Sequence, residues 1–290
     1  MNIRTTWLSR LDYLSFQTNR IGGELTDVSQ KLTTGLEISK PSDSPELTAR
    51  LMNIKREIAD QERFHEDSSY ALNLLDVADQ VLVDMSQVVS NARQLAVQMG
   101  SDTYLGPART ASAEQASQLL DQAMDLVNTA VAGRHLFAGE AYDTQPYADD
   151  LSYQGADEAS RIDVSDQSNT IVGFVAEDLN LGSVLQAIAD LQTALETDSA
   201  DAVRLTLDGL IAATDTISNA QTTVGVEQAT AIDFVDLTES MKLELEVQRS
   251  ALEDADALEA VMRMSQLQSQ YDAALAVTSQ MNLGSLFDRI

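Results

Sequence analysis

The side chains best suited to chemistry are few in this sequence and lie far apart. Histidine occurs only at positions 65 and 135, and cysteine is absent, which excludes disulfides and thiolate chemistry. Neither His65 nor His135 has neighbours at the spacing of metal ligands, so an exposed or capping role is favoured for both. No metal site and no other cofactor site is predicted.

Two short segments resemble parts of functional sites, but each lacks an essential feature. Residues 133–139 (GRHLFAG) contain two glycines without the Lys-Ser/Thr ending of a phosphate-binding loop. The acidic run 253–256 (EDAD) is predicted to be the solvated face of a helix. The other carboxylates show no acid–base pairing. The sequence therefore predicts that the protein is not an enzyme.

The charge balance argues against two common classes of partner. The chain has 46 acidic and 18 basic residues and a net charge of −28, so a nucleic-acid backbone or an anionic membrane would repel it. Between residues 134 and 242 only Arg161 and Arg204 are basic, which predicts an acidic, solvated central surface. No apolar run reaches the length of a membrane-spanning helix. The first residues lack the features of a secretory signal peptide, so composition alone favours the cytoplasm.

Both ends of the chain carry heptad repeats, with seam positions at alternating intervals of three and four. The first helix is predicted to end at Gly35. Gly22 and Gly23 inside it cost roughly 2 kcal/mol relative to alanine, so this helix needs a partner. The N-terminal seam comprises Trp7, Leu11, Leu14, Thr18, Ile21, Leu25, Val28 and Leu32, and the C-terminal seam Ala257, Ala260, Met264, Leu267, Tyr271, Ala274, Thr278 and Met281.

A heptad seam does not by itself reveal which helix fills it. The two ends could pair with each other inside one chain, as in an ordinary intramolecular bundle. They could equally meet the same segments of a neighbouring subunit. On periodicity alone both arrangements remain open.

The middle of the chain predicts further helices and a small β region. A loop with prolines at 41 and 45 precedes a helix over 46–99 that contains no Gly or Pro. After a loop over 100–107, a third helix is predicted to end at Gly133. Alternating patterns at 161–164 and 170–174 indicate strands. Helices are predicted again over 181–195, 203–220 and 224–282.

These elements predict a mainly α fold. We expect a long antiparallel helical bundle or coiled-coil rod with paired N- and C-terminal helices, plus a small β-containing outer domain. The predicted segments are an N-terminal assembly helix and Pro loop (1–45), a helical rod (46–139), a small β-containing outer region (140–180), a helical part of that outer region (181–223) and a C-terminal rod and assembly helix (224–290).

Three stretches resemble the bacterial flagellin superfamily, most closely its hook-associated protein 3 branch. Residues 31–38 (KLTTGLEI) and 41–45 (PSDSP) are similar to the family's N-terminal signature. The segments 133–139 and 153–155 (YQG) resemble an element of the junction branch, and the end of the chain from residue 249 resembles the family's C-terminal helix. Ser44 stands where the family usually has a second Asp, and Glu37 replaces a basic residue.

The resemblance implies a structural adaptor between hook and filament that self-assembles through its terminal helices, with filament flagellin as the alternative. It implies export through the flagellar type III apparatus to the extracellular flagellum, with the help of an export chaperone. The implied partners are copies of the chain itself, a neighbouring hook-associated protein and flagellin, with no nucleic acid and no membrane. An enzyme built on the β region and a cytoplasmic coiled-coil scaffold are the less favoured alternatives.

The expected assembly interface follows from the two seams together with this resemblance. It consists of Trp7, Leu11, Leu14, Ile21, Leu25, Val28, Leu32, Met264, Leu267, Tyr271, Ala274 and Met281.

Overall fold

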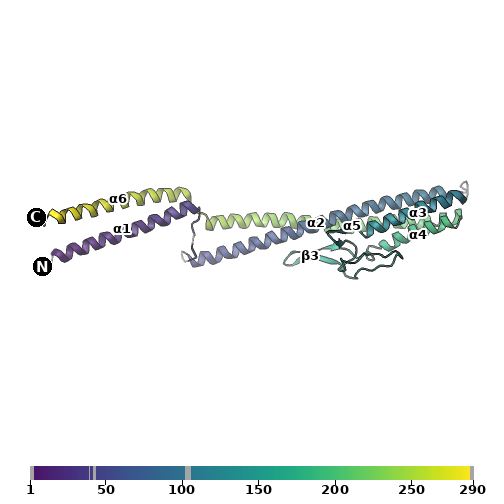
Figure 1. Cartoon of the computed structure of the whole chain (residues 1–290), viewed down its shortest axis with the longest axis horizontal. Coiled ribbons are helices and arrows are strands. Elements are labelled where there is room, and N and C mark those ends of the chain that lie inside the picture. The colour runs from purple at the N-terminus through teal and green to yellow at the C-terminus, as the bar shows by residue number, and fades with distance from the viewer. Residues whose placement is uncertain (1–2, 39, 42–43, 102–105, 288–290) are drawn as a thin grey trace. The chain divides into compact units, whose positions relative to one another are not determined.

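The computed structural model describes residues 3–38, 40–41, 44–101 and 106–287; the side chains of residues 3–8, 11, 106 and 281–287 lie outside this description. The described part is mainly helical with two small antiparallel sheets (Figure 1), which confirms the predicted fold class. Its elements are α1 (Ile3–Thr34), α2 (Pro45–Met99), α3 (Gly106–Val127), β1 (Ala130–Val131), β2 (Arg134–His135), β3 (Ser160–Ser165), β4 (Ser168–Gly173), α4 (Leu181–Glu196), α5 (Ala200–Glu253) and α6 (Ala257–Phe287).

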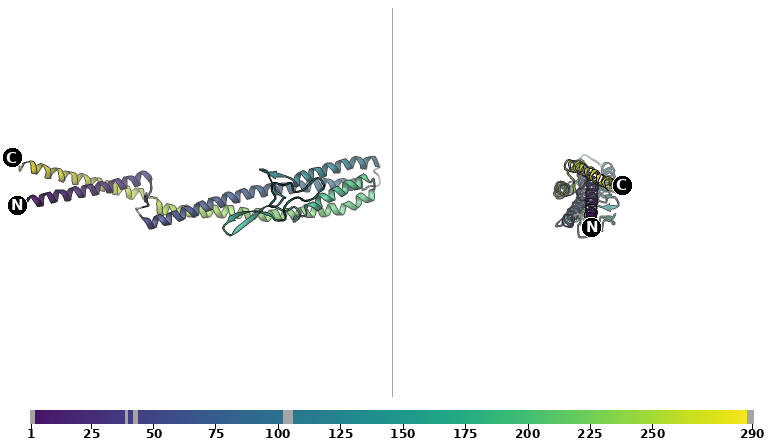
Figure 2. Two further views of the ribbon diagram at one scale, coloured as in Figure 1. Left: turned by 60° about the horizontal axis from the view of Figure 1, so that its bottom comes forward. Right: turned by 90° about the vertical axis from the view of Figure 1, so that its left-hand side faces the viewer.

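The chain divides into two compact units. The terminal unit comprises residues 1–59 and 242–290, and the central unit comprises residues 60–241. In the terminal unit α1 and α6 lie side by side, with the start of α1 and the end of α6 at the same end of the pair (Figures 1 and 2). The two terminal helices therefore pair antiparallel within one chain. Gly35, at a φ of +73°, ends α1 as predicted, because glycine tolerates this left-handed backbone.

The helix expected over 224–282 is interrupted at residues 254–256. A side-chain oxygen of Asp256 accepts the backbone N–H groups of Leu258 and Glu259 at 2.9 and 3.1 Å, so Asp256 is the N-cap of α6. The N–H of Ala255 donates to the carbonyl of Gly35, and the N–H of Glu37 donates to the carbonyl of Glu253, at 2.9 and 2.7 Å. The acidic run is thus a connector hydrogen-bonded to the α1–α2 connector, and the prediction of a solvated helix face was wrong.

The core of the central unit is built from one face each of α2, α3, α4 and α5. The helix predicted over 46–99 is confirmed as α2. The interruption expected near residue 222 is absent, since α5 runs through it with Ala220 and Val224 buried. The largest fully buried side chains include Leu74, Leu75, Leu82, Met85, Leu136, Phe137, Leu181, Leu185, Ile188, Leu191, Leu195 and Leu210.

The third helix ends at Val127, earlier than the predicted Gly133. The next residues form the hairpin β1–β2, in which Ala132 and Gly133 have φ values of 52° and 82°. Two consecutive left-handed residues make the tight turn that suits a two-residue hairpin, and glycine adopts that backbone readily. The hairpin therefore replaces the last turn expected for the helix.

A second hairpin forms the predicted β region. β3 and β4 pair antiparallel, with Ile162 opposite Thr170, and correspond to the strands expected from the alternating patterns. Glu227 on α5 accepts hydrogen bonds from the hydroxyl of Thr170 at 2.7 Å and from the N–H of Ile171 at 3.1 Å. This carboxylate ties β4 to α5.

The segments 133–139 and 153–155 come together beside this hairpin. The N–H of Ala156 donates to the carbonyl of Ala138 at 2.9 Å, and the hydroxyl of Tyr153 donates to the carbonyl of Ala156 at 3.0 Å. The rings of Tyr147 and Tyr153 lie 5.5 Å apart. Burial, reinforced by the charge of Glu177, raises the pKa of each tyrosine to about 12.

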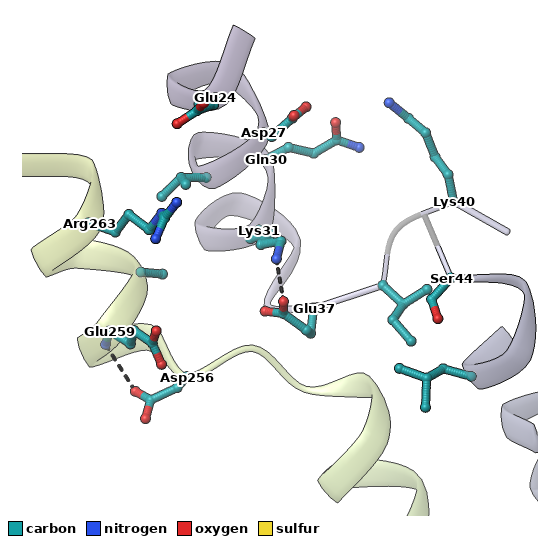
Figure 3. A pocket seen from close by; sticks show the side chains of 14 residues that line it. Glu24, Asp27, Gln30, Lys31, Glu37, Lys40, Ser44, Asp256, Glu259 and Arg263 are labelled. Carbon is teal, nitrogen blue, oxygen red and sulfur yellow. Dashed lines mark hydrogen bonds and ion pairs between the residues drawn. The ribbon is translucent and has the colours of Figure 1, made fainter. Parts of the chain in front are cut away.

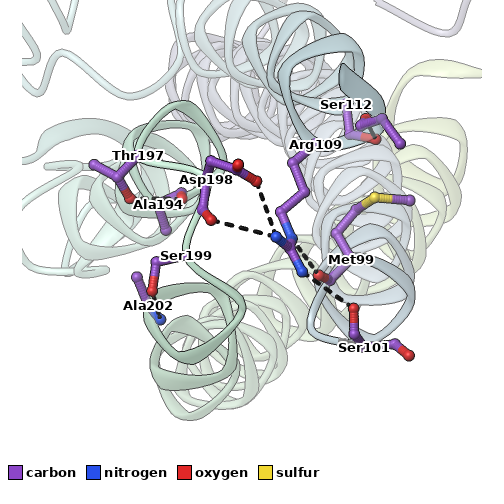
Figure 4. A network of polar contacts seen from close by, with 10 residues as sticks. Met99, Ser101, Arg109, Ser112, Ala194, Thr197, Asp198, Ser199 and Ala202 are labelled. Atoms are coloured by element: carbon purple, nitrogen blue, oxygen red, sulfur yellow. Dashed lines mark hydrogen bonds and ion pairs between the residues drawn. The ribbon is translucent and has the colours of Figure 1, made fainter. Parts of the chain in front are cut away.

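Arg109 on α3 contacts two other segments at one end of the central bundle. Its guanidinium donates to the carbonyls of Met99 and Ser101, both at 3.2 Å, and to the carboxylate of Asp198 at 2.9 Å (Figure 4). Only 8% of the Arg109 side chain is exposed. A buried arginine of this kind satisfies carbonyls at the end of a helix that has no further turn to bond them. Arg109 thereby joins the end of α2 to the α4–α5 turn.

Candidate assembly surface

The two histidines make polar contacts within the central unit. His135 Nδ1 lies 2.8 Å from the carbonyl oxygen of Asn128, just after α3, and His65 Nδ1 lies 3.3 Å from the hydroxyl of Thr238. Within the described residues, no group of His, Asp or Glu side chains is arranged to hold a metal ion. Among the same residues, no helix is both long and apolar enough to cross a membrane.

Most of the predicted seam lies between α1 and α6. Val28, Ala260 and Leu267 are buried there, and Ile21, Leu25, Leu32 and Met264 pack against them. Leu14, Tyr271 and Ala274 are partly buried on the two helices. The side chains of Trp7, Leu11 and Met281 lie outside the described part. The described seam thus fills the contact between the two ends of one chain, and its role between subunits stays a prediction.

The outer surface of this helix pair carries large apolar side chains that sequence reasoning missed. Tyr13 and Phe16 on α1 are 62% and 66% exposed, and Leu258 on α6 is 71% exposed. Val261, Met262, Leu275 and Val277 are also about half exposed or more. The available signal was a second set of apolar residues beside each seam, such as Tyr13 and Phe16 on either side of Leu14. These exposed apolar side chains make the outer surface of the pair a candidate interaction face, although large apolar residues such as Leu205 are exposed on the central unit as well.

The electrostatics of the terminal pair differ from those of the rest of the chain. Helices α1 and α6 together contain five basic and five acidic residues. The central unit contains six basic and 31 acidic residues. Copies of the terminal pair can therefore approach one another without net repulsion, whereas the central units repel one another.

An open cleft of about 700 Å³ lies where the two connectors meet α1 and α6 (Figure 3). Its walls carry both signs of charge, including Asp27, Lys31, Glu37 and Arg263. Lys31 and Glu37 form an ion pair across the end of α1. On the other wall Asp256 caps α6 through the N–H of Glu259. These polar contacts fix the two connectors at the base of the terminal pair.

Comparisons with known proteins agree with this geometry. The bacterial flagellin N-terminal helical region matches residues 15–141, and the bacterial flagellin C-terminal helical region matches residues 207–287. A flagellin from Listeria innocua serovar 6a is 22% identical over 97% of this chain and 96% of its own.

Two solved structures show the same fold. A putative flagellar hook-associated protein from Vibrio parahaemolyticus, 16% identical, superposes with a TM-score of 0.67 over 73% of this chain and all of its own. The flagellar junction protein FlgL from Legionella pneumophila, 13% identical, has a TM-score of 0.57 over 72% of this chain and all of its own. The two matched helical regions cover most of the chain. They include α1 from residue 15 onwards and all of α6. The chain therefore belongs to the bacterial flagellin family, a family of structural proteins of the flagellum.

Proposed function

We propose that this protein is a self-assembling structural subunit of the bacterial flagellum, placed at the junction between hook and filament. The observation that carries the proposal is the terminal helix pair, which is neutral overall and exposes large apolar side chains. Burying that surface against other subunits would supply the driving force of assembly. No catalysed reaction is part of the proposal.

The pairing of α1 with α6 gives each end of the chain a defined place in assembly. The seam from Leu14 to Leu32 and from Met264 to Ala274 would act by forming the pair, which then presents Tyr13 and Phe16 to a neighbour. Trp7, Leu11 and Met281 continue the same heptad spacing. The assembly interface then has two layers, a seam inside one chain and an apolar face between chains.

The junction is favoured over the filament because the solved chains of like fold are described as hook-associated and junction proteins. The flagellin relative, at only 22% identity, does not favour the alternative, filament flagellin. The partners proposed for the junction role are further copies of the chain, a hook-associated protein on one side and flagellin on the other. We also propose that the chain is exported by the flagellar type III apparatus with the help of a chaperone. Its proposed location is extracellular.

The proposal is tested by placing charge on the exposed face of the terminal pair. Tyr13→Asp combined with Phe16→Asp should keep the chain folded but abolish its incorporation into flagella, because charged side chains cannot be buried there. Tyr70→Asp, at a tyrosine of the central unit that is 40% exposed, is the matched control. Normal incorporation of the double variant would refute the assigned face.

The place of the protein is tested separately by immunolabelling isolated flagella. Label confined to the hook–filament boundary is the expected result. Label along the whole filament would favour filament flagellin. Absence of the protein from purified flagella would overturn the flagellar function altogether.

A further inference from the structure

Helices α2 and α5 each bury a row of side chains that repeats at intervals of seven residues. Every member of the two rows is at most 3% exposed. A row with this interval is the contact face of a helix pair. The row on α2 comprises Ser68, Leu75, Leu82, Val89 and Ala96, and the row on α5 comprises Val203, Leu210, Ile217, Val224, Ala231 and Thr238.

Two contacts between side chains define the register of α5 on α2. His65 Nδ1 lies 3.3 Å from the hydroxyl of Thr238, and the amide of Gln228 donates to the carboxylate of Asp76 at 3.0 Å. Residue numbers rise along α2 where they fall along α5, so the two helices are antiparallel. A displacement of α5 by seven residues, about 10 Å, would again bring buried apolar positions together. Apolar burial alone therefore discriminates poorly between the observed register and the displaced ones.

Polar side chains interrupt the two rows beside each other. Among the buried residues that the structure describes on α2 and α5, only Ser68 and Thr238 are polar. His65, one turn before Ser68, is partly buried and reaches Thr238. The apolar core shared by four helices begins at Ala71 on α2 and ends at Ala231 on α5. His65, Ser68 and Thr238 thus form a polar layer at the edge of that core.

The hydrogen bonds of this polar layer assign one role to each side chain. The hydroxyl of Thr238 donates to the carbonyl oxygens of Phe234 and Val235, at 2.7 and 3.0 Å. Because its proton is engaged there, its oxygen accepts from His65 Nδ1, which must carry a proton. The hydroxyl of Ser68 has no hydrogen-bond partner within the described part of the chain. A buried hydroxyl without a partner costs stability, so stability does not account for the polar layer.

We propose that the polar layer of His65, Ser68 and Thr238 fixes the register of α5 on α2. A displacement of α5 by seven residues would bring Ala231 or Leu245 to the place of Thr238. Neither side chain can accept a proton from His65 Nδ1, so each displaced register lacks a hydrogen bond that the observed one has. A single polar position fixes register in coiled coils at a similar cost in stability. This role belongs to the single chain and is independent of the flagellar function proposed above.

Cross-linking after refolding measures the register, because the chain contains no cysteine of its own. The pair Asp76→Cys/Gln228→Cys reports the observed register, since these two side chains are in contact. The pairs Asp76→Cys/Gln221→Cys and Asp76→Cys/Val235→Cys report the two displaced registers. Each protein is unfolded in denaturant, refolded and treated with a short thiol cross-linker. While the polar layer is intact, only the first pair should react strongly.

Removal of the polar layer should populate the displaced registers. The triple variant His65→Leu/Ser68→Ala/Thr238→Val should raise cross-linking of the two displaced pairs about tenfold, because no polar group then distinguishes the registers. Ile217→Val changes the same row on α5 without a change in polarity. It is the matched control, and no increase is expected from it. Cross-linking that stays confined to the pair for the observed register would overturn the proposal.

The single variant Thr238→Val decides the question even if the triple variant does not refold. It nearly preserves the shape of the side chain and removes the acceptor for His65. Cross-linking of the displaced pairs should therefore rise about threefold. Circular dichroism verifies that the variant is helical. An unchanged ratio of the three cross-linked pairs in the helical variant would contradict a role of Thr238 in the register.

The nitrogen resonances of the two histidines give an independent measurement. The proton of the neutral His65 ring should lie on Nδ1. His135 is the internal reference, because its Nδ1 faces the carbonyl oxygen of Asn128, which can only accept. Thr238→Val should shift the Nδ1 resonance of His65 and leave that of His135 in place. A proton found on Nε2 of His65 would remove the hydrogen bond on which the register depends and would overturn the proposal.

Discussion

The central and terminal units of this chain differ in how they bury apolar side chains and in their surface charge. The central unit has a wide apolar core shared by four helices and carries 31 acidic against six basic residues, although some large apolar side chains, such as Leu205 and Val226, remain exposed on it. The terminal unit has a narrow seam centred on Val28, Ala260 and Leu267 and leaves large apolar groups outside. A wide core with a repelling surface suits a unit that is stable alone. A thin seam in a unit of nearly balanced charge, with 15 acidic and 12 basic residues, suits a unit completed by its neighbours.

This contrast predicts that a cavity in the central core has the largest effect on folding. Leu185→Ala removes a fully buried side chain and should lower the free energy of unfolding of the central unit by about 3 kcal/mol. Leu205→Ala, at a leucine that is 78% exposed, is the control and should change it by less than about 0.5 kcal/mol. Denaturant unfolding followed by site-resolved hydrogen exchange separates the two units. Equal losses in the two variants would contradict the assigned core.

The second-largest effect is expected at high pH, which should lower the free energy of unfolding of the central unit. The pKa of Tyr147 is raised to about 12 from 10.0. Its contribution to the free energy of unfolding is therefore fully present below pH 10. That stability falls as the pH rises from 10 to 12, by about 2 kcal/mol for this side chain alone. Tyr147→Phe removes the ionisable group and should flatten the dependence of unfolding on pH in this window. An unchanged dependence in the variant would contradict the assignment.

Loss of the Arg109 side chain should lower the free energy of unfolding by a smaller amount. Arg109→Ala leaves the carbonyls of Met99 and Ser101 without their guanidinium partner and should cost about 1–2 kcal/mol. Faster hydrogen exchange is expected at the end of α2 and in the α4–α5 turn. Arg93→Ala, at an exposed position of α2, is the matched control. Similar exchange in the two variants would show that Arg109 does not hold these segments together.

The cap of α6 should give the smallest effect, and only in the terminal unit. Asp256→Ala removes the acceptor for the N–H groups of Leu258 and Glu259 and should cost about 1 kcal/mol. Asp272→Ala, on an exposed position of the same helix, should leave the first turn of α6 unchanged. Fraying of that turn, seen as faster amide exchange, measures the difference. Faster exchange in the core of the central unit of the same variant would contradict the division into two units.

Much of the fold follows from periodicity, because apolar spacing and helix caps are local features of the sequence. The end of α1, the extents of α2 and α4 and the presence of strands at β3 and β4 were predicted correctly. The interruption between α5 and α6 was missed, although Asp256 and Glu259 have the spacing of a capping box. The hairpin after α3 was missed because its left-handed turn uses Ala132 beside Gly133, and alanine gives no warning of that backbone.

The candidate site was predictable in part. Heptad spacing identified the seam, but spacing does not show which partner fills it, and the structure places α6 of the same chain there. The outer face of Tyr13 and Phe16 could be recognised only once the seam had been assigned.

Hydrogen exchange before and after assembly tests the central claim most directly. If the terminal pair is the assembling part, amides of α1 and α6 should exchange rapidly in the monomer and become strongly protected in the assembled protein. The core of the central unit should be protected equally in both states. Strong protection of α1 and α6 already in the monomer, with new protection on assembly confined to the central unit, would contradict the account.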